Sequence, residues 1–135
     1  MFRRFVTPSR SLLRTMSSAP VSAAPPARKL FFVWAPDKTE EGTFQKRLSV
    51  REKHLVTAKE RIEGGFIRLG GMVTTPESIA TPDTPKKMIG STFICEAESL
   101  DEVRKKVEND IYYTSGVWDP EKLVILPFFG ATTIP

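Results

Sequence analysis

Two short runs of consecutive apolar residues limit what this chain can fold into. The first, KLFFVWA, covers residues 29–35, and the second, KLVILPFF, covers residues 122–129. Neighbouring residues of a β-strand point to opposite faces of a sheet, so strands of this composition place apolar side chains on both faces. Large exposed apolar patches are rare on soluble monomers. These runs therefore predict strands that are covered on both faces.

Hydrophobic periodicity and turn residues predict six elements in the order βαββαβ. The predicted strands cover residues 29–35, 66–74, 89–97 and 122–129, and the predicted helices cover residues 44–63 and 99–109. Residues 110–118 are expected to form a helical turn or an ordered loop. This order is the ferredoxin-like arrangement of an α+β fold, with helices on one face of an antiparallel sheet. Because the other face is also apolar, we expect two subunits to join sheet to sheet as a homodimer of the α/β barrel type.

The first helix carries an apolar stripe. Leu48, Leu55 and Ile62 recur at a spacing of seven, which predicts that this side of the helix faces the core. A capping box at Ser49 is one candidate for the start of the helix, and Phe44 is the alternative.

Glycine, proline and serine refine the other elements. Gly70-Gly71 predicts a second strand that is weakened or bulged in its middle. Three prolines predict a surface loop over residues 75–88. A second capping box predicts that Ser99 opens the second helix. Pro127 places the last strand at an edge of the sheet or at a bulge.

The positive charge of the chain is concentrated at its start. The 135 residues have a net charge of +4, and residues 1–36 hold six of the 20 basic residues and no acidic one. Residues 37–135 therefore hold 14 basic and 16 acidic residues. This part lacks the positive excess that binds a phosphate backbone, so no nucleic-acid partner is expected.

A basic, serine-rich and acid-free start is typical of a mitochondrial transit peptide, with a disordered basic tail as the alternative. We expect residues 1–28 to form a transit peptide and flexible linker, with cleavage near residues 15–18. Residues 29–135 are expected to form one α+β domain. The predicted location is the mitochondrion, in the matrix.

Composition also argues against several kinds of site. Cys95 is the one cysteine and His54 the one histidine, so cysteine- or histidine-rich metal centres are excluded. A carboxylate-bound magnesium or calcium site is the alternative left open, but no clustered acidic loop indicates one, so no metal is expected. Cys95 lies in a predicted strand and is expected in the core. No dedicated cofactor motif is present, so no cofactor is expected, although a haem- or flavin-assisted oxygenase on the same fold stays an alternative. No apolar run approaches the roughly 20 residues that span a bilayer, so no membrane partner is expected.

His54 lies at the border of the apolar stripe, beside two arginines. Arg47, Arg51 and His54 fall at i, i+4 and i+7, along one edge of the helix. An imidazole can move a proton near neutral pH, and an arginine can hold a carboxylate. These residues favour a site for an anionic or enolate-forming small molecule. A solvated helix edge with an incidental histidine is the alternative that spacing leaves open.

Several segments together resemble the YciI-like, or YCII-related, domain family. The resemblance runs from about residue 29 to residue 129, and its elements follow one another in order. They are Arg51-x-x-His54-Leu55, Gly70-Gly71 in the second strand, Gly90-Ser91 opening the third, the ESLDE helix start at residues 98–102, Asp110-x-Tyr112, and Gly116-Val117.

The resemblance implies a dimeric barrel with a histidine–aspartate dyad, matched here by His54 and Asp110. The family's usual proline after the aspartate is replaced by Ile111, which is expected to loosen the turn that orients Asp110. Ser91 or Tyr112 could offer a polar contact to substrate. The implied function is a cofactor-free lyase, isomerase or dehydrochlorinase-like enzyme acting on a small carbonyl or carboxylate substrate. A non-enzymatic ligand-binding or assembly module on the same barrel is the alternative.

Overall fold

The computed structural model describes residues 18–20 and 22–134, and its elements follow the predicted order. The elements are β1 (Lys29–Pro36), α1 (Thr43–Glu63), β2 (Ile67–Thr74), the 3-10 turn η1 (Pro76–Ile79), β3 (Met88–Ala97), α2 (Leu100–Glu108), the short helix α3 (Ile111–Thr114) and β4 (Val124–Phe128). The predicted ferredoxin-like α+β fold is confirmed.

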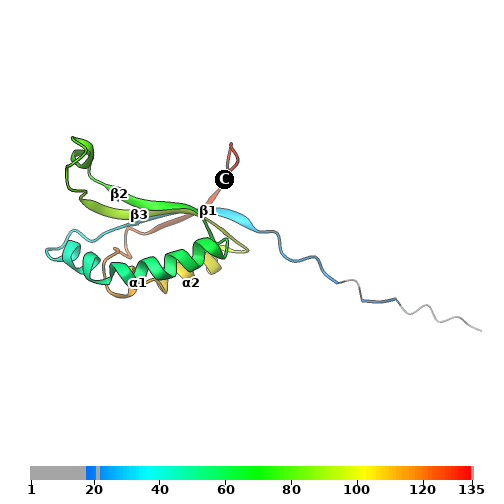
Figure 1. Cartoon of the computed structure of the whole chain (residues 1–135). Coiled ribbons are helices and arrows are strands. Elements are labelled where there is room, and N and C mark those ends of the chain that lie inside the picture. Colours follow the sequence, from blue (N-terminus) through cyan, green and yellow to red (C-terminus); the bar gives the residue numbers. More distant parts are fainter. Residues whose placement is uncertain (1–17, 21, 135) are drawn as a thin grey trace, which may run out of the picture.

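The four strands form one antiparallel sheet in the order β2-β3-β1-β4. Figure 1 shows α1 and α2 on one side of this sheet, while the segment after β4 leaves on the other side. Pro127 lies in β4, an edge strand, as predicted. An edge strand tolerates proline, which has no backbone N–H, because no neighbouring strand lies on its outer side to accept that hydrogen bond.

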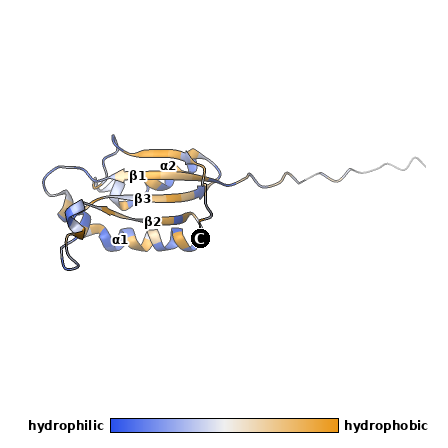
Figure 2. Cartoon of the chain, turned by 90° about the horizontal axis from the view of Figure 1, so that it is seen from above, coloured by the Kyte–Doolittle hydropathy of each residue, from blue (hydrophilic) through white to orange (hydrophobic). Residues whose placement is uncertain are grey.

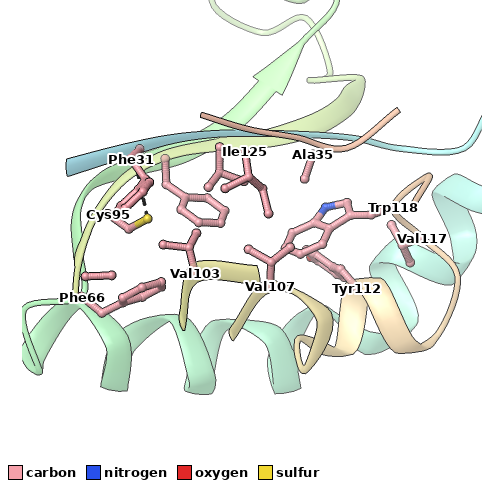
Figure 3. Packing of buried hydrophobic residues seen from close by; sticks show 13 residues of the cluster. Phe31, Ala35, Phe66, Cys95, Val103, Val107, Tyr112, Val117, Trp118 and Ile125 are labelled. Atoms are coloured by element: carbon pink, nitrogen blue, oxygen red, sulfur yellow. Dashed lines mark hydrogen bonds between the residues drawn. The ribbon is translucent and has the colours of Figure 1, made fainter. Parts of the chain in front are cut away.

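The hydrophobic core lies between the sheet and the helices. Side chains at every second position of β1, beginning with Phe31, are buried and face Val103 and Val107 of α2 (Figure 3). Cys95 of β3 belongs to this core, as predicted, and its Sγ donates a 3.7 Å hydrogen bond to the carbonyl oxygen of Phe31. Burial raises the pKa of the Cys95 thiol to about 12, so this sulfur is not a nucleophile near neutral pH.

The other face of the sheet carries a second set of apolar side chains. The register pairs Phe32 with Ile94 and Leu126, and Trp34 with Thr92 and Val124. Seen from above in Figure 2, the strands are coloured mainly as hydrophobic. In the isolated chain, Leu126 is 55% exposed. We call this surface the open face.

A glycine before Ser91 is required by close packing on the open face. A Cβ at Gly90 would lie 2.5 Å from Cη2 of Trp34 and 2.8 Å from the carbonyl oxygen of Ala35. The indole of Trp34 therefore occupies the space that any side chain at position 90 would need.

The two predicted capping boxes have different outcomes. The α1 helix begins at Thr43, one residue before the earlier of the two predicted starts, and Ser49 lies inside it with its hydroxyl donating to the carbonyl oxygen of Lys46. Ser99 does cap α2, because its side chain accepts a 3.1 Å hydrogen bond from the backbone N–H of Glu102.

The expected bulge in the middle of β2 needs correction, whereas the surface loop after it is confirmed. The register shifts lie between Ile67 and Leu69 and between Val73 and Thr74, at the ends of β2 and not at its glycines. The loop over residues 75–88 is mostly exposed but contains η1, whose Ser78 is buried. The Ser78 hydroxyl oxygen accepts a hydrogen bond from the backbone N–H of Lys87, which ties the two ends of the loop together.

The prediction that the apolar stripe of α1 faces the core is wrong. Leu48, Leu55 and Ile62 are 42%, 44% and 56% exposed, whereas Arg47 is buried. Figure 2 shows α1 alongside β2, at that edge of the sheet. The charged side of α1 is buried instead because its side chains pair with buried acidic residues, as described below.

The region before β1 contributes no helix or strand over residues 22–28, which extend away from the domain in Figure 1. Most of the predicted transit peptide, residues 1–17, lies outside the described residues. None of the helices in the described part of the chain is both long and apolar enough to cross a membrane.

Candidate active site

One side of α1 supplies three cationic or titratable side chains to the interior. Arg47, His54 and Arg61 are spaced by seven residues, about two helical turns, so they align along one edge. Arg47 is 2% exposed, and the side chains of His54 and Arg61 are 16% and 13% exposed.

The structure brings together His54 and Asp110, which are 56 residues apart. The Nδ1 atom of His54 lies 2.8 Å from Oδ1 of Asp110, and Asp110 is 2% exposed. A carboxylate only accepts hydrogen bonds, so Nδ1 carries the proton that it donates. The lone pair of a neutral His54 ring is then on Nε2.

Asp110 is held by its position as the N-cap of α3. Its Oδ1 accepts a 3.0 Å hydrogen bond from the backbone N–H of Tyr112, and its backbone has the extended conformation typical of a cap. The turn forms with Ile111 in place of the family's usual proline, and the Asp110 cap supports it. At 2% exposed, Asp110 is a buried residue and does not face solvent.

Arg61 is a site residue that the sequence analysis missed. Its Nη1 donates to Oδ2 of Asp110 at 3.2 Å, and its Nη2 donates to the carbonyl oxygen of Lys106 at 2.6 Å. Burial lowers the pKa of the Arg61 guanidinium, and the Asp110 carboxylate opposes that fall. The Asp110 carboxylate thus accepts from three donors: His54, Arg61 and the backbone N–H of Tyr112. The seven-residue spacing from His54 was the signal that could have found Arg61.

Two aromatic rings pack against the imidazole of His54. The ring of Tyr112 stacks on His54 with centroids 3.9 Å apart and an interplanar angle of 17°. Trp118 meets both rings edge-on, and Figure 3 shows it directly above Tyr112 in the core. Burial raises the pKa of the Tyr112 hydroxyl, which keeps it neutral. Tyr112 is therefore mainly a packing partner of His54.

Arg47 pairs with buried groups of the protein. Its Nη1 donates to Oδ1 of Asp37 at 2.6 Å, and its Nη2 donates to Oγ of Ser91 at 3.0 Å. Its guanidinium carbon also lies 4.4 Å from the ring centroid of Tyr112. Burial raises the pKa of Asp37, and Arg47 offsets part of that rise. Asp37 was not singled out from sequence, where it is simply the first acidic residue after β1.

A cavity of about 270 Å³ opens between α1 and the β2–β3 half of the sheet. Its polar wall includes all six residues predicted from sequence: Arg47, Arg51, His54, Ser91, Asp110 and Tyr112. Its apolar wall includes Leu55, Ile62, Ile67, Met72, Met88 and Phe93. Arg51 is half-buried and forms no ion pair with any described residue. Leu55 and Ile62, from the apolar stripe of α1 that was expected to face the core, therefore line the cavity.

The cavity therefore contains an imidazole that can transfer a proton, an arginine that can attract an anion, and an apolar wall. Over the described residues, no group of three or more histidine, cysteine or acidic side chains is placed to hold a metal.

Comparison with known proteins gives three findings. The solved structure of 5-chloro-2-hydroxyhydroquinone dehydrochlorinase (TftG) from Burkholderia phenoliruptrix AC1100, in complex with 2,5-dihydroxybenzoquinone, is similar to this chain. The two are 28% identical with a TM-score of 0.62, and the match covers 74% of this chain and 93% of that one. No curated protein matches the chain. The YCII-related domain family matches residues 30–128, and the chain belongs to that family.

Proposed function

We propose that this protein is an enzyme of the lyase or isomerase type that moves a proton on a small carbonyl or carboxylate substrate without a cofactor. The observation that carries the proposal is the 2.8 Å contact between His54 and Asp110 in the wall of a cavity. A histidine whose tautomer is set by a buried carboxylate is suited to general acid–base catalysis.

In the proposed step, Nε2 of His54 removes a proton from a carbon next to a carbonyl group. The electrons of the C–H bond form a C=C bond, and the carbonyl π electrons move to oxygen, giving an enolate. The imidazolium that forms is stabilised by Asp110 at Nδ1. Return of the proton to another carbon gives an isomer. When chloride sits on the neighbouring carbon, the enolate re-forms its carbonyl, the C=C electrons form a new double bond to that carbon, and chloride leaves with the electrons of the C–Cl bond. His54 then releases its proton to water, so the net loss is HCl.

The cavity favours a small planar substrate with negative charge. Leu55, Ile62 and Phe93 supply apolar contacts, and Arg51 has a guanidinium with no acidic partner among the described residues. The dehydrochlorinase similar to this chain holds 2,5-dihydroxybenzoquinone in its structure, which is a flat ring with acidic hydroxyl groups. We therefore include chlorinated hydroxyhydroquinones among the candidate substrates, in the keto tautomer that carries a carbonyl group and a saturated ring carbon.

The test is proton exchange at carbon, since it needs no knowledge of the complete reaction. Enolisable carbonyl compounds and 5-chloro-2-hydroxyhydroquinone are incubated with the protein in D₂O, and loss of C–H signal and release of chloride are followed. We expect exchange or chloride release that falls by about 10²–10⁴-fold in His54→Ala. Lys53→Ala, an exposed neighbour on α1, is the matched control and should keep the wild-type rate.

Equal rates in wild type and His54→Ala would remove the enzymatic proposal. Binding of the compounds without exchange or chloride release would favour the ligand-binding module.

Two further proposals concern assembly and location. We propose that the open face is covered by a second copy of the chain, because most of its residues are apolar and Leu126 is 55% exposed in the single subunit. We also propose import into the mitochondrial matrix, which rests on the composition of residues 1–28. Deleting residues 1–16 from a fluorescent fusion should release it from mitochondria, and an unchanged location would refute import.

A further inference from the structure

The buried Asp37–Arg47–Ser91 chain has a role that the His54–Asp110 pair does not explain. Asp37, Arg47 and Ser91 are 9%, 2% and 6% exposed, and two hydrogen bonds of 2.6 and 3.0 Å connect them. A buried ion pair contributes little net stability, because desolvation of both charges offsets their attraction. The position of this one beside the cavity points instead to a task in the site.

The direction of these hydrogen bonds decides what Ser91 can do. A guanidinium has only donors, so Oγ of Ser91 must accept from Nη2 of Arg47. The hydroxyl proton of Ser91 is then free, and no described residue accepts it. Because Ser91 lines the cavity, this proton is available to whatever occupies that cavity. The adjacent positive charge strengthens it as a donor.

We propose that Ser91 donates a hydrogen bond to the enolate oxygen of the substrate, an inference that rests on the function proposed above. Asp37 and Arg47 are positioning residues, because they leave the Ser91 hydroxyl as a donor. The substrate class is then a carbonyl compound whose oxygen becomes negative during the reaction, such as a hydroxyquinone. A donor prepared in advance stabilises this charge more than water would. It also means that Arg47 does not bind the substrate carboxylate itself, which leaves Arg51 for that task.

The test measures recognition of an oxyanion and does not depend on turnover. The probes are 2,5-dihydroxybenzoquinone, which is ionised at neutral pH, and 2,5-dimethoxybenzoquinone, which has the same ring without ionised oxygens. Their dissociation constants are measured by calorimetry for the whole chain. In wild type we expect the ionised probe to bind more tightly. Ser91→Ala should reduce that preference roughly tenfold, the value of a hydrogen bond to a charged group.

Further variants separate the hydroxyl from mere packing. Ser91→Thr keeps the hydroxyl and should keep much of the preference, and Ser49→Ala, an exposed serine of α1 outside the cavity, should leave it unchanged. Asp37→Asn should reduce the preference in the wild-type background and have no further effect in Ser91→Ala, because it acts through Ser91. In Ser91→Ala and in Asp37→Asn, the visible absorption band of bound 2,5-dihydroxybenzoquinone should shift back toward its position in water.

Two results would overturn the inference: equal affinity of the wild type for both probes, or an unchanged preference in Ser91→Ala. Neither result depends on His54. His54→Gln should abolish proton exchange while it keeps the preference for the ionised probe, so failure of the proposed function and failure of this inference are distinguishable.

Discussion

At the scale of the residue, the most informative feature is that charged groups occupy the buried edge of α1. Arg47, His54 and Arg61 each find an acidic partner that is itself at least nine-tenths buried, namely Asp37 or Asp110. Removing one member of such a pair leaves the other charge without its partner in a poorly solvated place, which costs about 3–5 kcal/mol. Stability and function should therefore be sensitive to single residues here.

Arg61→Ala should lower the free energy of unfolding by about 3 kcal/mol, because Asp110 loses a donor and the carbonyl of Lys106 loses its partner. Urea denaturation followed by circular dichroism measures it. The matched control is Arg104→Ala, whose i,i+4 ion pair with Glu108 is exposed and should be worth about 0.5 kcal/mol at most. Equal small losses in both variants would show that Arg61 is not a structural partner of Asp110.

Cys95 predicts a specific dependence of stability on pH. Folding raises the pKa of its thiol from 9.0 to about 12, so the folded state holds this proton more tightly than the unfolded state. The resulting stability is complete below pH 9 and is lost as the pH rises from 9 towards 12. Between pH 7 and about pH 10, wild type should lose about 1 kcal/mol more than Cys95→Ala.

Denaturation of wild type and Cys95→Ala at both pH values measures this difference. Other titrating groups are common to the two proteins and cancel. Parallel pH profiles would argue against a raised thiol pKa.

At the scale of the element, α1 and β2 enclose the cavity between them. The exposed stripe of α1 is not a failure of packing, because Leu55 and Ile62 form part of the apolar wall that a ligand would cover. Sequence periodicity detected this stripe correctly but assigned it to the core. Periodicity shows which residues share a side of a helix, and it does not show what that side contacts.

Ala58 gives a test of the cavity on the same helix. It lies one turn from His54 and lines the cavity, so Ala58→Leu should fill space that a ligand needs. We expect binding of 2,5-dihydroxybenzoquinone to weaken by roughly tenfold or more, with little change in unfolding free energy because both residues are good helix formers. Val56→Leu, at an exposed position outside the cavity, should bind normally. Normal binding by Ala58→Leu would place the ligand elsewhere.

At the scale of the whole molecule, the open face is the feature that a single subunit leaves unexplained. Phe32 and Trp34 of β1 lie beside Leu126 and Val124 of β4, and their alternation with core residues follows directly from the strand period. The consecutive apolar residues of the two runs therefore fill two surfaces, one against the helices and one against the proposed second subunit.

Phe32→Lys should convert the proposed dimer to a monomer, since a buried ammonium at the centre of an apolar interface is strongly unfavourable. Sedimentation equilibrium of wild type and variant measures the change in mass. Leu100→Lys, which adds the same charge at a 40% exposed position at the start of α2, should leave the dimer intact. A monomeric wild type would refute the proposed assembly, as would a Phe32→Lys variant that stays dimeric.

The sequence by itself determined the order of the elements, the serine cap of α2, the edge position of Pro127 and the apolar character of both sheet faces. Each of these depends on residues close together in one element, so spacing and residue type were sufficient. Only the tertiary structure decided which side of α1 is buried. It also decided that His54 meets Asp110, a pair that family resemblance but not spacing had indicated, and that Arg47 is engaged by Asp37 and Ser91. Those contacts join residues from different elements, and their geometry is set by how the elements pack.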